Sequence, residues 1–200
     1  WFLFPFAMLE AEVGALAQVD VGSSAGLTQL LSKIAYDISP GGLIGESDSL
    51  TIMCNISGTP PIPKQVPNVC WNVGLDAKPI DVHNDEEVRW LEACVWPDQV
   101  ERFDRLKKAI SLARHHDIVV HRGDAVDNVA PIIETAASHG HPVVTTSWVL
   151  NYLSPERRTA FVNKLDRIGS SRDLSWVIAE SPFETPELPG HAGSDELITV

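Results

Sequence analysis

The residues best suited to bind a ligand lie in one small-residue loop near the start of the chain. Between two apolar stretches the sequence reads Asp20, Val21, Gly22, Ser23, Ser24, Ala25 and Gly26. Residues 17–21 before it are typical of a strand, and the leucines after it recur at helical spacing, which predicts a helix over 27–34. Small residues let a ligand approach the backbone, and a helix that starts there offers free N–H groups. The segment is therefore predicted to be a ligand-binding loop.

Two kinds of loop chemistry match this segment in part. A dinucleotide-binding loop needs Gly-x-Gly-x-x-Gly, and here Ser24 and Leu27 stand where its second and third glycines belong. A hydrolase nucleophile turn needs Gly-x-Ser-x-Gly, which residues 22–26 fit with Ser24 as the nucleophile. Such a hydrolase also needs an acid and a histidine, for example Asp124 and His191, but no spacing fixes them. The serine hydrolase stays open as an alternative.

The loop also resembles motif I of the S-adenosylmethionine-dependent methyltransferases, in which a strand is followed by Asp-x-Gly-x-Gly-x-Gly. Gly22 and Gly26 match the outer glycines of that motif, and Ser24 replaces the middle one. The resemblance implies that the loop contacts the cofactor S-adenosylmethionine. The cofactor residues that it implies here are Asp20, Gly22, Ser23, Ser24 and Gly26.

Later segments resemble further strands of the same family, in the same order. Residues 73–79 resemble the second strand, whose terminal acid, here Asp76, would hold the ribose hydroxyls; a carboxylate can accept two hydrogen bonds from a diol. Residues 120–125 resemble the third strand, where Asp124 and the N–H of Ala125 would read the adenine edge. Residues 143–153 resemble the fourth strand and its turn, which includes Ser147, and residues 176–180 resemble the fifth.

This resemblance covers most of residues 18–180 and implies a methyltransferase, although nothing in the sequence indicates the methyl acceptor. The methyl group of a sulfonium is already activated, so catalysis depends on positioning and no catalytic triad is expected. The chain is also similar to a bacterial family known only as a domain of unknown function. The shared elements are the glycine loop, Gly-Leu-Asp at 74–76, Arg-Trp-Leu at 89–91 and Leu-x-Tyr-Leu-x-Pro-Glu-Arg at 150–157.

The position of Asp76 departs from the usual pattern. A ribose-binding acid usually follows the glycine loop by about 20 residues, and Asp76 lies far beyond that distance. We therefore expect residues 39–68 to be an insertion, a hairpin with a proline-rich loop. Asp37, at the end of the helix predicted over 27–34, is the alternative ribose ligand. The insertion and Ser24 also leave open a non-catalytic binding protein that keeps the fold.

The remaining elements predict how these residues are positioned. Strand patterns alternate with helix patterns, which predicts an α/β fold: a Rossmann-like, doubly wound, mostly parallel sheet with helices on both faces, in one domain over 1–200. In such sheets ligands bind at the carboxyl ends of the strands. The predicted strands are 50–54, 69–75, 117–121, 142–146, 174–179 and 197–200, and the predicted helices are 1–17, 84–114 with a break at Pro97, 127–139 and one that opens at Ser154.

The composition of the chain limits the binding partners and the cellular compartment that we expect for it. The formal net charge of −12 repels phosphate backbones, so nucleic acid is not an expected partner. Cys54, Cys70 and Cys94 form neither a disulfide framework nor a zinc motif, which indicates a cytoplasmic protein. Residues 1–9 are apolar, but a membrane span needs about 20 residues and a signal peptide needs basic residues, so neither is predicted. Without an initiator Met, the chain is interpreted as part of a longer one.

Other conspicuous side chains are interpreted as structural. Trp90, Trp96, Trp148 and Trp176 are predicted to lie mostly in the core, with Trp148 also able to border a pocket because it follows a strand. The histidines show no metal-ligand spacing, so no metal is expected. The charged run 101–108 is predicted to be a solvated helix face.

Overall fold

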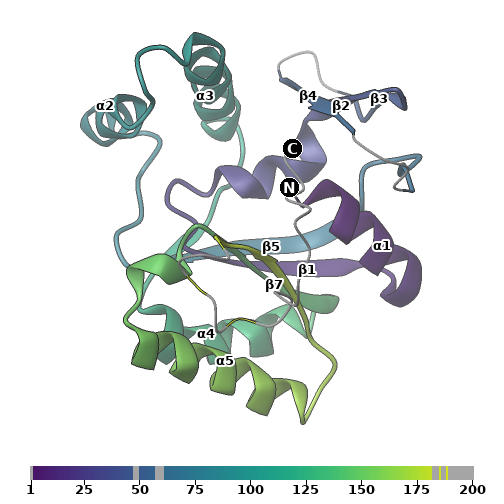
Figure 1. Cartoon of the computed structure of the whole chain (residues 1–200), viewed down its shortest axis with the longest axis vertical. Coiled ribbons are helices and arrows are strands. Elements are labelled where there is room, and N and C mark those ends of the chain that lie inside the picture. Colours follow the sequence, from purple (N-terminus) through teal and green to yellow (C-terminus); the bar gives the residue numbers. More distant parts are fainter. Residues whose placement is uncertain (1, 47–49, 57–60, 182–184, 186–187, 189–200) are drawn as a thin grey trace.

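A computed structural model describes residues 2–46, 50–56, 61–181, 185 and 188, and it shows an α/β fold (Figure 1). Five parallel strands form the central sheet, in the order β6-β5-β1-β7-β8. β1 (Leu16–Val21) lies at the centre, between β5 (Val69–Asp76) and β7 (His141–Ser147), while β6 (Val120–Arg122) and β8 (Ser175–Ala179) lie at the two ends. The predicted parallel sheet and Rossmann-like class are confirmed.

Helices cover both faces of this sheet (Figure 1). α4 (Ala125–Ala136) and α5 (Pro155–Gly169) lie on one face, and α1 (Leu3–Val13) and the 3₁₀ helix η1 (Leu27–Lys33) lie on the other. α5 starts where the sequence predicts, because Ser154 accepts a hydrogen bond from the N–H of Arg157 and Pro155 occupies the first turn. The short 3₁₀ helix η2 (Leu150–Tyr152) connects β7 to α5.

Two further helices, α2 (Asp85–Ala93) and α3 (Val100–Ala113), connect β5 to β6. In Figure 1 they stand apart from the sheet, at the upper left. The chain is not helical at Pro97, so the predicted break is confirmed. Asn84 caps α2 by accepting a hydrogen bond from the N–H of Glu86, which explains why the helix begins there.

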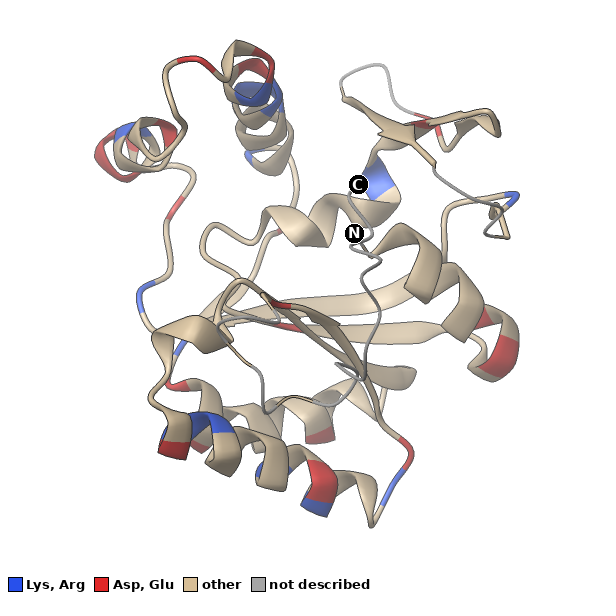
Figure 2. Ribbon diagram, viewed as in Figure 1, with Lys and Arg blue, Asp and Glu red and all other residues tan. Residues whose placement is uncertain are grey.

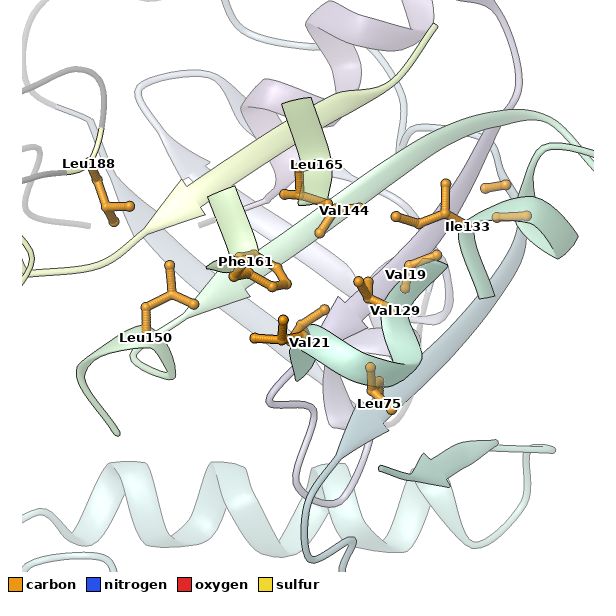
Figure 3. Packing of buried hydrophobic residues seen from close by; sticks show 13 residues of the cluster. Val19, Val21, Leu75, Val129, Ile133, Val144, Leu150, Phe161, Leu165 and Leu188 are labelled. Atoms are coloured by element: carbon orange, nitrogen blue, oxygen red, sulfur yellow. The ribbon is translucent and has the colours of Figure 1, made fainter. Parts of the chain in front are cut away.

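The largest core lies between the sheet and the pair α4 and α5 (Figure 3). Successive residues of a strand point to opposite faces, so Ala17, Val19 and Val21 of β1 face this core while Gln18 and Asp20 face the η1 side. Phe161 of α5 is fully buried in it, and burying such a side chain stabilises the fold by about 1.5–3 kcal/mol. This core fixes the central strand, whose carboxyl end carries the small-residue loop.

The expected insertion is a small second sheet rather than a hairpin alone. β2 (Ala35–Ser39) pairs antiparallel with β3 (Gly42–Ile44), which confirms the hairpin, but it also pairs parallel with β4 (Thr51–Asn55). Its inward residues, including Ile38, pack on α1 and the amino-terminal half of the main sheet. Asp37 is exposed on the outward face of β2. Its assignment to the end of a helix was therefore wrong, because the chain is already extended at Ile34.

Several predicted boundaries need correction. The first helix ends at Val13, where Gly14 takes a positive φ of 81°, and residues 16 and 17 belong to β1. The helix predicted over 27–34 is the 3₁₀ helix η1. In it the hydroxyl of Thr28 donates to the carboxylate of Asp20, and the side-chain amide of Gln29 donates to the carbonyl of Val119. The strand predicted over 117–121 begins only at Val120. The strand predicted over 197–200 lies outside the described residues.

The burial of three tryptophans differs from the prediction. Trp90, Trp96 and Trp148 are 68%, 71% and 56% exposed, so placing them in the core was wrong. Trp176 is partly buried, packs edge-on against Phe161 and donates to Thr146. Within the described ranges, no helix is both long enough and apolar enough to cross a lipid bilayer.

Candidate functional site

The strand order places a topological switch point between β1 and β7. From β1 the chain continues to β5 and β6 on one side, and β7 and β8 lie on the other. Open α/β sheets bind ligands at such a point, outside the carboxyl ends of the strands. The loops after β1 and β7 also contain the two non-glycine residues with positive φ in the described part of the chain, Ser24 at 52° and Trp148 at 53°. Such strain costs about 1–3 kcal/mol and concentrates at ligand sites.

The small-residue loop is held against the end of β5. The N–H of Gly22 donates to the carbonyl of Leu75 at 2.8 Å, and the N–H of Ser24 donates to Oδ2 of Asp76 at 2.8 Å. The other oxygen, Oδ1 of Asp76, accepts from the N–H of Lys78 at 2.8 Å. Asp76 therefore lies beside the loop even though 52 residues separate it from Ser24. The predicted position of Asp76 on the same sheet edge as Gly22 is confirmed.

Close packing leaves little room for larger residues around the loop. Gly22 has a φ of 77°, and a Cβ atom added to it would overlap the side chain of Val149, in the turn after β7. A Cβ atom on Gly74 of β5 would overlap the side chain of Ser23. Gly26 ends the loop with a φ of 68°. Glycine is thus required at these positions for close approach or for backbone conformation.

Asp20 lies in the sheet interior, not at its surface. It is only 3% exposed, and its carboxyl accepts hydrogen bonds from the hydroxyls of Thr28 and Thr145. Thr145 in turn accepts from the amide of Gln18 at 3.3 Å. Desolvation by burial raises the pKa of Asp20 above its ordinary value, although the threonine hydroxyls oppose that shift. These buried hydrogen bonds join β1 to β7 and to η1, the helix that follows the loop, and so hold both ends of the loop in place.

Asp124 follows β6 and caps α4. Its Oδ1 accepts from the N–H groups of Val126 at 2.8 Å and Asp127 at 3.1 Å, and Arg157 of α5 donates to the same carboxylate. Partial burial raises the pKa of Asp124, but these N–H donors and the Arg157 guanidinium outweigh it and hold the pKa below its usual range. Asp124 is thus a helix cap, and contact with adenine stays a prediction. Ala125 is the first residue of α4.

The turn after β7 is fixed by the end of β8. Ser147 pairs in register with Ala179, whose carbonyl accepts from the N–H of Trp148 at 3.1 Å. Oε1 of Glu180 accepts from the N–H of Val149 at 3.2 Å. These two bonds maintain the positive φ of Trp148 and leave its indole exposed. Its place directly after a strand is the signal from which the sequence predicted that Trp148 could border a pocket.

The structure does not assemble a hydrolase triad among the residues that it describes. In those ranges no hydrogen bond joins a histidine to Ser24, and His191 lies outside them. His141 contacts Ser175 at 2.9 Å, at the amino ends of β7 and β8 and therefore at the opposite edge of the sheet. The described residues also contain no group of three or more side chains suited to bind a metal ion.

The fold and this sheet edge define a Rossmann-like α/β protein with a candidate ligand site at the ends of β1, β5 and β7. The chain belongs to a bacterial family described as "Uncharacterized protein conserved in bacteria (DUF2332)", whose model matches residues 2–198. Neither the curated proteins nor the solved structures include a match to the chain.

Proposed function

We propose that this protein binds S-adenosylmethionine at the carboxyl ends of β1, β5 and β7 and transfers its methyl group to an acceptor. The observation that carries the proposal is the contact between Ser24 and Asp76, at 2.8 Å. It joins the glycine loop to an acid at the end of the neighbouring strand, beside the switch point, as the resemblance of both segments to methyltransferase motifs implies.

The hydrogen bonds of the loop favour this cofactor over a dinucleotide. A pyrophosphate is bound by free N–H groups at a strand-to-helix turn. Here the N–H groups of Gly22, Ser24 and Gly26 already donate to Leu75, Asp76 and Ser23. The carboxylate of Asp76 beside the loop would also attract the positively charged sulfonium and ammonium of S-adenosylmethionine.

The capacity of Asp76 also fits a ribose. A carboxylate offers about four acceptor positions, and Asp76 uses two of them on the N–H groups of Ser24 and Lys78. The remaining positions suit the two hydroxyls of a diol. When bound, the cofactor would supply an activated methyl group, and the protein would orient it through the loop and the rigid turn at Trp148.

Calorimetric titration tests the proposal. Titrate the protein with S-adenosylmethionine, S-adenosylhomocysteine and, as the control ligand, NAD. We expect saturable binding of the first two and none of NAD. Binding of NAD alone would replace the proposal with a dinucleotide site, and absence of binding by all three would refute it. Transfer of an isotopically labelled methyl group to a cell extract would then separate an enzyme from a non-catalytic binding protein.

One observation favours a second candidate, a serine hydrolase. Ser24 has a left-handed backbone in a sharp strand-to-helix turn, as a hydrolase nucleophile does. A fluorophosphonate probe decides between the two. Labelling of the protein that disappears in Ser24→Ala would establish the hydrolase, whereas we expect no labelling.

A further inference from the structure

An apolar surface stripe joins α2 to α3. Between residues 90 and 100, six apolar residues are exposed to solvent, and Trp90, Trp96 and Val100 are each more than 60% exposed. The other three are Ala93, Cys94 and Pro97. Two nearly free indoles six residues apart are unusual, because tryptophan carries a large apolar area that normally becomes buried. The stripe therefore indicates a surface that another molecule covers.

A surface hollow lies at the carboxyl end of this stripe. An open hollow of about 510 Å³ lies at the start of α3, directly after the stripe. Arg102 and Arg105 line it together with the carboxylates of Asp98 and Glu101, and arginine stacks on an indole more often than lysine does. Among the described residues a cation–π contact joins Lys107 to the ring of Phe103, and no such contact joins Arg102 or Arg105 to a tryptophan.

The two helices also carry opposite charge. α2 has four carboxylates and one arginine, whereas α3 has four basic and two acidic residues (Figure 2). Most of these side chains are exposed, including the run 101–108. In a chain with a net charge of −12, α3 is thus a basic exception placed beside an acidic helix. A surface that presents both signs around an apolar centre is complementary to itself.

We propose that a second copy of this chain covers the stripe, in a two-fold symmetric dimer formed by α2 and α3. Two-fold symmetry brings each patch against its own copy, and the opposite charges of the two helices favour the arrangement in which α2 of one subunit faces α3 of its partner. The acidic helix then meets the basic one twice, and a tryptophan of each subunit enters the arginine-walled hollow of the other. This surface is separate from the loop at Ser24, so the dimer does not depend on the proposed cofactor.

Sedimentation velocity across protein concentration tests the dimer. The wild-type chain should show a monomer–dimer equilibrium that shifts toward monomer between 50 and 500 mM salt, values chosen on the order of the range in which exposed charges become screened. The double variant Trp90→Ser/Trp96→Ser should weaken association at least about tenfold, because tryptophans near an interface centre dominate its affinity. Arg102→Glu/Arg105→Glu should weaken it as well.

The matched control is Met53→Ser, which removes an equally exposed apolar side chain from the small sheet. It should leave the dimer unchanged. Circular dichroism melts of all variants confirm that each is folded, as expected for exposed positions. A wild-type chain that stays monomeric at every concentration overturns the proposal. A dimer that survives both double variants, or that Met53→Ser disrupts equally, overturns it too.

Discussion

The carboxylate of Asp76 and the backbone N–H of Ser24 lie 2.8 Å apart, joining the ends of two adjacent parallel strands. This contact brings together an acid and a glycine loop that 52 residues separate. It fixes Ser24 in a left-handed conformation at the switch point of the sheet. This bond therefore contributes to the shape of the candidate site, together with the bond from Gly22 to Leu75, and places a carboxylate in it.

The first prediction concerns Asp76. Asp76→Ala should weaken the binding of S-adenosylmethionine by about 1–3 kcal/mol, since hydrogen bonds to a charged group are lost. Calorimetry measures the change directly. Asp81→Ala is the control, because Asp81 also accepts a backbone N–H bond nearby, from His83, and is exposed. Equal affinities of Asp76→Ala and wild type would remove the ribose assignment.

The second prediction concerns the cap at Asp124. Asp124→Ala should lower the free energy of unfolding by about 1 kcal/mol at pH 7, the usual cost of a lost helix cap. The pKa of Asp124 is lowered in the folded state, so its contribution is present above the unfolded pKa near 4 and is lost as the pH falls through the folded value. Urea denaturation at pH 7 and pH 3 should therefore show a smaller effect in acid.

Asp127→Ala controls for the ion pair with Arg157, because it leaves the cap of α4 intact. Cofactor affinity should be measured on the same Asp124→Ala protein. A weaker cofactor complex with unchanged stability would mean that Asp124 binds the ligand and that the cap contributes nothing measurable.

The third prediction follows from the buried carboxyl of Asp20, whose folded-state pKa is raised by desolvation. Stability from such a group is fully present below the unfolded pKa and is lost as the pH rises through the folded pKa. Asp20→Asn stays neutral at every pH. Its stability relative to wild type should therefore improve as the pH rises from about 4 toward 7, which denaturation curves at several pH values would reveal. A difference that does not vary with pH would contradict this assignment.

The fourth prediction uses the strain at Ser24. Glycine adopts a φ of 52° without steric cost, so Ser24→Gly should stabilise the fold by up to about 1 kcal/mol. The control Ser23→Gly, at a neighbour without a positive φ, should instead be destabilising. Thermal melts compare the two. If Ser24→Gly lowers the melting temperature, the serine hydroxyl has a structural role that outweighs the strain.

The sequence predicted the parallel sheet because its strands are apolar runs bounded by turns, and β1, β5, β7 and β8 all lie within two residues of their expected bounds. It could not predict that Trp90 and Trp96 are exposed, because tryptophan is highly buried on average and only tertiary contacts decide which side chains are covered. The helix over 27–34 was predicted, but its 3₁₀ geometry was not, for a similar reason. The side chain of Thr28 donates to Asp20 in β1, and that of Gln29 donates to the carbonyl of Val119, 90 residues away and just before β6.

Because Gly74 has no side chain, the loop that contains Ser23 can pack directly against β5. Ser23 occupies the volume that a Cβ atom at position 74 would fill, so the strand and the loop share one space. A genetic selection would therefore find Gly74→Ala tolerated only together with a second-site suppressor such as Ser23→Gly. Family members that differ at one of these two positions should accordingly differ at both.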